Sequence, residues 1–141
     1  MYDVLKSAHS GWAYLLLLVL AVATINSIIG FVGKKEFGNK DFSLALVGLI
    51  VTHIQLLIGI VSYFTPQNLG RWEGFEMSNS GIRLLLIEHP LVMIIAVTLL
   101  TIGYSKHKKK IVSKGKFKML AIFYTLAFLA VVSRLPWSQW L

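Results

Sequence analysis

The chain has 141 residues, of which 56% are apolar and only 14% are charged. Water-soluble domains are much less apolar, so this composition excludes an ordinary soluble protein. The absence of cysteine excludes disulfide bonds, thiolate metal sites, iron–sulfur clusters and haem attached through a Cys-x-x-Cys-His motif.

The apolar residues form four long blocks, which in chain order cover residues 11–32, 42–64, 82–104 and 117–132. A helix rises about 1.5 Å per residue, so about 20 residues cross a hydrocarbon core about 30 Å thick. We therefore expect an all-α integral membrane protein. Its 141 residues form a single four-span transmembrane domain, residues 1–141, with little chain left for anything else.

The first block follows His9 closely. Ala21-Val22-Ala23 is similar to the cleavage site of a signal peptide, but the apolar run continues to Val32, which predicts a retained span. At a membrane edge a histidine is easily hydrated. His9 is therefore either a ligand or a solvated residue at the start of the span.

The second block carries His53 near its middle. A neutral imidazole in hydrocarbon is costly unless something binds it, so His53 is a candidate ligand, and a hydrogen bond to the backbone or a neighbouring helix is the alternative. A separate stripe of the same helix is expected to let a neighbouring helix approach closely, because its residues are small or polar. This stripe consists of Gly48, Thr52, Gln55, Gly59 and Ser62.

The long connection over residues 65–81 contains Trp72 and Phe75 among polar residues. Amphipathic aromatic side chains collect at membrane interfaces, so we expect this segment to rest in the outer interface. We expect the remaining tryptophans to complete an outer aromatic belt. These are Trp12, Trp137 and Trp140.

The third block begins with Glu88-His89-Pro90 a short distance inside it. Proline cannot donate a backbone hydrogen bond, so Pro90 is expected to disturb the preceding turn and free a carbonyl group. Such a bend can aim His89 at a ligand. Glu88 either forms an ion pair with Arg83 or Arg134, or orients a metal-ligating side chain through a hydrogen bond.

Basic residues concentrate in the first and third connections, which contain ten of the 14 lysines and arginines. Short basic loops stay cytoplasmic, so both termini and the long connection are predicted to lie outside. Short connections favour an antiparallel up-down-up-down four-helix bundle. Beside two spans the run 105–118 is expected to contact lipid headgroups rather than nucleic acid, with His107 as a solvated loop residue.

His9, His53 and His89 occur on three different expected helices and predict a shared ligand, of which haem iron held by histidine nitrogen is the most economical. Either His53–His89 or His9–His89 is the axial pair. Three histidines with a carboxylate could instead hold zinc, copper or non-haem iron, which would require them to lie close together. Arg83 and Arg134 flank spans and are the preferred partners of haem propionates, with Arg71 and Lys6 as further cations and simple snorkelling as the alternative.

Several short motifs add a resemblance that covers nearly the whole chain. They are Met1-Tyr2, His9-Ser10-Gly11, His53-x-Gln55-Leu56-Leu57-Ile58-Gly59, Glu88-His89, Gly103-Tyr104-Ser105 and Pro136-Trp137. Together they resemble a family of small bacterial four-helix membrane proteins described as cytochrome b-like, and more distantly the cytochrome b561 and CopD-type bundles. The resemblance implies haem b held by histidines that match His9, His53 and His89. It also implies a location in the cytoplasmic (inner) membrane of a bacterium and electron exchange with a quinone or a redox partner protein. The fourth block has no histidine, so the two-haem arrangement of cytochrome b561 is not expected.

The leading hypothesis is a membrane haem-b protein for electron transfer, linked to quinone or acting as a subunit of a redox complex. Whether it is an enzyme stays open, since a cytochrome can be a relay alone. One alternative is a haem-free accessory or scaffold subunit whose histidines only bridge helices. Another is a small transporter or metal permease, which would need to act as a homo-oligomer or within a larger complex.

Overall fold

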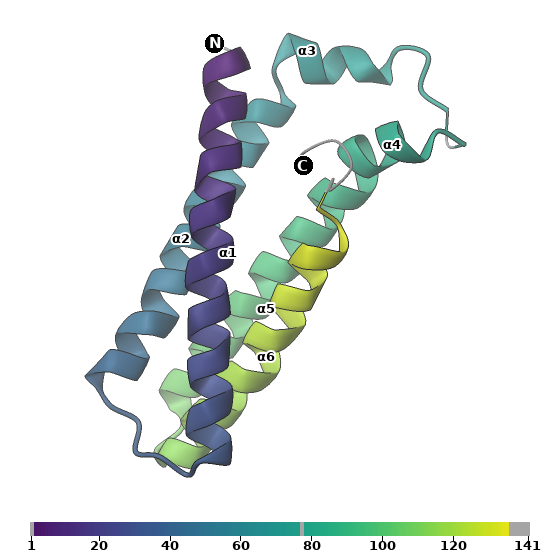
Figure 1. Ribbon diagram of the computed structural model, residues 1–141. Coiled ribbons are helices and arrows are strands. Elements are labelled where there is room, and N and C mark those ends of the chain that lie inside the picture. Colours follow the sequence, from purple (N-terminus) through teal and green to yellow (C-terminus); the bar gives the residue numbers. More distant parts are fainter. Residues whose placement is uncertain (1, 77, 136–141) are drawn as a thin grey trace.

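The computed structural model describes residues 2–76 and 78–135, and within them the chain is helical with no strand (Figure 1). The long helices are α1 (Tyr2–Val32), α2 (Asn39–Tyr63), α5 (His89–Lys109) and α6 (Ser113–Ser133). Between α2 and α5 lie the short elements α3 (Pro66–Leu69), η1 (Gly70–Trp72), α4 (Ser80–Arg83) and η2 (Leu84–Glu88). Because α4, η2 and α5 are continuous, the third span covers Ser80–Lys109.

Four helices are therefore long and apolar enough to cross a membrane, which confirms the predicted all-α membrane bundle. They form two antiparallel hairpins, α1–α2 and α5–α6 (Figure 1). Helix α1 packs against α2 and α6, and α5 packs against α6 and α2. The hairpins converge where α1 ends and diverge toward the end where it begins (Figure 1).

Helix α1 begins at Tyr2 rather than beside the apolar block at Gly11, so His9 lies within the helix and not at its edge. Asp3 in the first turn favours this extension, because a carboxylate is stabilised near the positive end of a helix dipole. The prediction of the helix itself is correct, and its start is nine residues earlier than the apolar pattern indicated.

The converging end holds the basic connections and is called the lysine-rich end below. Its helices pack tightly around glycines. A Cβ atom added to Gly103 of α5 would lie 2.4 Å from Cβ of Phe123 on α6, and one added to Gly30 would lie 2.3 Å from the Phe117 ring. Tyr124 is fully buried between the hairpins, and its hydroxyl donates to the carbonyl of Ala45 at 2.7 Å.

His107 contradicts its prediction as a solvated loop residue, because it is completely buried at the lysine-rich end. Helix α5 continues to Lys109, past the end of the apolar block, since lysines favour the last turn of a helix. The continued helix turns His107 inward, where its ring lies 5.5 Å from Phe37, 5.9 Å from Phe42 and 4.9 Å from Tyr104. His107 is buried because α5 extends beyond the apolar block, although the residues around it in the sequence are basic.

The predicted aromatic belt is only partly supported. Trp72 is 43% exposed and its ring lies 5.1 Å from Phe75, as expected for an interfacial loop. Trp12 instead donates its indole N–H to the carbonyl of Val51 at 2.8 Å and so joins α1 to α2. Trp137 and Trp140 lie outside the described residues.

Replacement of Gly103 by alanine is expected to destabilise the bundle by about 1–3 kcal/mol, because the new methyl group would force α5 and α6 apart. Gly11→Ala is the matched control, since a Cβ atom there meets nothing within 4 Å. Thermal unfolding in detergent measures both. Equal unfolding temperatures for the two variants would contradict the close helix contact.

Candidate functional site

A cavity of about 470 Å³ lies between the two hairpins, away from the lysine-rich end. It will be called the histidine cavity. Its walls come from α1, α2, η2, α5 and the end of α6, and η1 contributes Arg71. The polar residues that line it are Lys6, His9, Ser10, Thr52, Gln55, Ser62, Tyr63, Asn68, Arg71 and His89.

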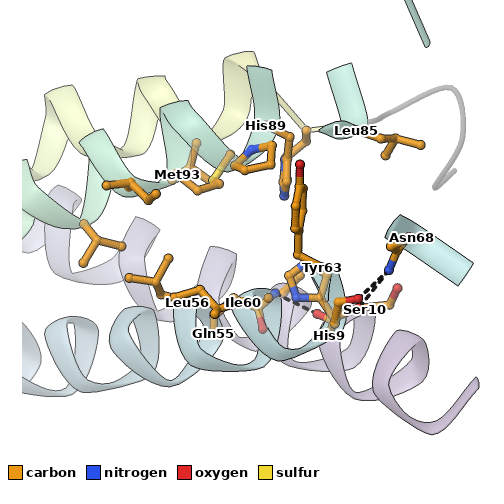
Figure 2. A pocket seen from close by; sticks show the side chains of 18 of the residues that line it. His9, Ser10, Gln55, Leu56, Ile60, Tyr63, Asn68, Leu85, His89 and Met93 are labelled. Atoms are coloured by element: carbon orange, nitrogen blue, oxygen red, sulfur yellow. Dashed lines mark hydrogen bonds between the residues drawn. The ribbon is translucent and has the colours of Figure 1, made fainter. Parts of the chain in front are cut away.

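Two of the three predicted histidines meet in this cavity. His9 on α1 and His89 at the start of α5 lie on opposite sides of it (Figure 2). Their ring centroids are 6.2 Å apart and their ring planes are nearly perpendicular, at 86°. Residues separated by 80 positions in the chain are thus brought to one site.

The position of His89 follows from the proline beside it. Pro90 has no N–H to donate to the carbonyl of Leu86, four residues earlier, and this carbonyl instead accepts a hydrogen bond from the Tyr63 hydroxyl at 2.9 Å. The preceding residues form a π-helical turn, η2, in which the His89 N–H reaches back to Leu84. The predicted disturbance and freed carbonyl are confirmed.

A hydrogen bond to the backbone fixes the orientation of the His89 ring. Its Nδ1 donates a proton to the carbonyl of Arg134 at 2.8 Å, just beyond the end of α6. A carbonyl can only accept, so Nδ1 carries the hydrogen, and Nε2 of the neutral ring keeps its lone pair. A histidine that ligates a metal is commonly oriented by this kind of bond from its other nitrogen.

His9 is positioned by the polar stripe of α2. Gln55 Nε2 donates to the His9 carbonyl at 2.8 Å (Figure 2), which fixes the register of α1 against α2. Gly59 leaves room for the His9 ring, since a Cβ atom there would lie 3.3 Å from His9 Cε1. The stripe therefore does admit a close neighbour, as predicted. His9 Nδ1 is buried and has no hydrogen-bond partner among the described residues.

The structure does not bring His53 to the other two histidines. His53 does not line the cavity; its Nδ1 donates to the carbonyl of Leu49 at 2.8 Å, and its Nε2 lies 3.4 Å from the Thr101 hydroxyl. This is the backbone-bonded and helix-bridging arrangement that was the alternative for His53. Of the two predicted axial pairs, only His9–His89 is assembled here.

The cations of the cavity are not the two preferred from sequence. Arg83 Nε lies 3.5 Å from Glu88, so one of the two predicted pairings of Glu88 is formed. Arg134 contributes its backbone carbonyl to His89, but neither arginine lines the cavity. Lys6 and Arg71 do. The long connection crosses the open end of the bundle (Figure 1) and brings Arg71 there, so the two further cations of the sequence analysis, and not the preferred pair, line the cavity.

Tyr63 and Asn68 are polar cavity residues that sequence reasoning missed, and Tyr63 is the more informative of the two. It reaches from α2 across the cavity toward α5 (Figure 2). The sequence shows a tyrosine at the end of one apolar span and a proline in the next. It does not show that the tyrosine hydroxyl reaches the carbonyl freed by the proline, because that contact depends on how α2 packs against η2. In the described ranges, no group of three or more histidine or acidic side chains is close enough to hold a metal ion.

The fold and cavity define a multi-pass helical membrane protein with a histidine-lined cavity at one end. No family model matches the chain, and no solved structure matches it. It is similar to the "Uncharacterized amino acid permease YvbW" of Bacillus subtilis (strain 168), with 26% identity over 139 aligned residues. The alignment covers 86% of this chain, which spans only 30% of that relative's length.

Replacement of Tyr63 by phenylalanine is expected to lower the free energy of unfolding by about 1 kcal/mol, because the Leu86 carbonyl loses its hydroxyl partner. In a Pro90→Ala background the new amide N–H can bond that carbonyl, so the same change should cost less. Unfolding of the four proteins in mixed micelles gives the double-mutant cycle. Strictly additive effects would show that the proline and the tyrosine are not coupled.

Proposed function

We propose that the protein binds haem b between His9 and His89 and transfers electrons within the membrane. The observation that supports this most directly is the separation of the two rings. A metal bound at about 2.0–2.1 Å by each of two imidazole nitrogens places the ring centroids about 6 Å apart. The observed separation is 6.2 Å. Perpendicular ring planes are compatible with this arrangement, because two imidazole nitrogens can bind one metal at any angle between the planes of their rings.

The state of the two imidazoles also fits an iron ligand. His89 directs its proton to the Arg134 carbonyl, which leaves Nε2 as the nitrogen available for a ligand. Buried polar atoms are nearly always satisfied, and His9 Nδ1 is an exception. A group that binds in the cavity would give the His9 ring the partner it lacks. Haem requires at most two axial ligands from the protein, whereas bare metal ions usually require three or four.

The rest of the cavity suits a flat apolar cofactor that carries two carboxylates. Apolar side chains of α2 and α5, among them Leu56, Met93 and Val97, form facing walls. Lys6 and Arg71 lie on the same cavity and would pair with the propionates. When bound, haem supplies one-electron redox chemistry, while the chain supplies its ligands and keeps water away.

The electron partners fit a protein embedded in lipid. Long helices with many exposed apolar side chains contact the bilayer, so a quinone dissolved in the membrane or a redox protein bound beside the bundle is the partner class. We place the protein in the bacterial cytoplasmic membrane, as the family resemblance implies, and its lysine-rich end inside, on the charge pattern of its connections. The resemblance to small bacterial cytochrome b-like proteins that His9-Ser10-Gly11 and Glu88-His89 suggest would imply the same function.

Purified protein is expected to give Soret and α bands in a reduced-minus-oxidised spectrum and a b-type pyridine haemochrome. His9→Ala and His89→Ala should each abolish most haem binding, because each removes an axial ligand. His53→Ala is the matched control and should retain the bands, since its ring nitrogens face Leu49 and Thr101. Haem loss in the His53 variant alone, or no haem in the protein when it is produced with haem supplied, would refute the assignment.

Transport of an amino acid is a second candidate function, favoured by the similarity to a protein named as an amino acid permease. The histidine cavity would then bind the substrate, with Lys6 and Arg71 facing its carboxylate. With four spans, the transport path would be formed by an oligomer or together with another subunit.

Proteoliposomes separate the two candidates. If transport is the function, they should accumulate radiolabelled amino acids, and Arg71→Gln should reduce the rate several-fold while haem-free protein stays fully active. If haem binding is the function, uptake should equal that of empty liposomes. If Arg71→Gln leaves uptake unchanged, the histidine cavity is not the binding site of the transported amino acid.

A further inference from the structure

A second hollow, of about 400 Å³, lies on α5 at the lysine-rich end, far from the histidine cavity. Three lysines and two hydroxyl residues line it, together with a single apolar side chain. The residues are Thr101, Ile102, Ser105, Lys106, Lys109 and Lys110. All three lysines are exposed, and residues 105–118 include no acidic residue that could neutralise them. The hollow is therefore suited to an anionic group.

An exposed stripe leads from this hollow along α5 toward the middle of the membrane. At spacings of three and four residues it runs through Leu91, Ile95, Thr98, Ile102 and Ser105 to Lys109. The part from Leu91 to Ile102 rises about 16 Å at about 1.5 Å per residue, which is close to half of a hydrocarbon core about 30 Å thick. One lipid leaflet has that thickness.

The depth of the lysines matches lipid headgroups. The apolar block of this span ends at Tyr104, so Lys106 and Lys109 lie about 3–8 Å beyond it at about 1.5 Å per residue. The connection that follows carries Ile111, 95% exposed, and the exposed Val112. Apolar side chains at this level rest in the membrane interface and keep Lys110 beside the headgroups.

We propose that this face of α5 is a binding site for one anionic phospholipid. Its phosphate is held by the ammonium groups of Lys106, Lys109 and Lys110 and by the Ser105 hydroxyl. One acyl chain lies along the stripe from Ile102 to Leu91. Each lysine near a membrane surface adds attraction to anionic lipid, and the apolar stripe restricts the ligand to one that carries a chain. The site is independent of the histidine cavity and of its proposed function.

Native mass spectrometry of the full chain in detergent tests this site with phosphatidylglycerol and phosphatidylcholine of identical acyl chains. The protein should bind the first phosphatidylglycerol more tightly than phosphatidylcholine. The triple variant K106Q/K109Q/K110Q should weaken that binding by at least about tenfold, whereas the control K34Q/K35Q/K118Q should weaken it by less than about threefold. The control removes the same charge from exposed lysines at the same end.

Equal weakening in both triple variants would overturn the proposal, because it would mean that only diffuse charge attracts the lipid. Equal binding of the two lipids would also overturn it. Displacement of the lipid by glycerol 3-phosphate would show a site for free phosphate esters rather than for a membrane lipid. If the triple variant is produced poorly, Lys106→Gln and Lys109→Gln alone should each show part of the loss, and no loss in either would count against the site.

Discussion

The missing amide hydrogen of Pro90 is the constraint on which the cavity end depends. A transmembrane helix must satisfy its backbone groups within the protein, because the hydrocarbon offers no water. The Leu86 carbonyl has lost its intrahelical donor, and Tyr63 of another helix supplies a replacement. The same turn is π-helical and leads directly into His89. One covalent feature thus joins α2 to the third span and sets the direction of a cavity histidine.

The two ends of the bundle differ because their contact residues differ in size. At the lysine-rich end Gly30 and Gly103 let aromatic rings approach the helix backbones closely, and the fully buried His107 packs against the ring of Tyr104. At the other end the side chains of His9 and His89, from different hairpins, lie on opposite sides of the cavity, and the hairpins diverge. Tight packing at one end makes the open space at the other possible, since the hairpins are held together below it.

The fate of the three histidines shows how far sequence alone can go. All three were expected to converge, because each is a costly group in an apolar block. His53 Nδ1 bonds the carbonyl four residues earlier in its own helix, and Nε2 lies 3.4 Å from the Thr101 hydroxyl of α5, so both nitrogens have partners away from the cavity. His89 reaches a carbonyl 45 residues away, at the end of α6. The energetic cost of an imidazole within the membrane predicts that each ring has a partner. It does not predict whether that partner lies in the same helix or in another one.

The sequence by itself determined the four spans, their antiparallel order, the polar stripe of α2 and the disturbance at Pro90, because each follows from local properties such as hydropathy, spacing or a missing donor. It placed helix ends less well, and so it missed the burial of His107 and the extension of α1. Only the tertiary structure decided that His9 meets His89, that Tyr63 serves the Leu86 carbonyl and that Arg71 reaches the cavity. These contacts depend on the rotation and offset of helices about each other. Side-chain packing across the whole bundle sets them, and no segment specifies them alone.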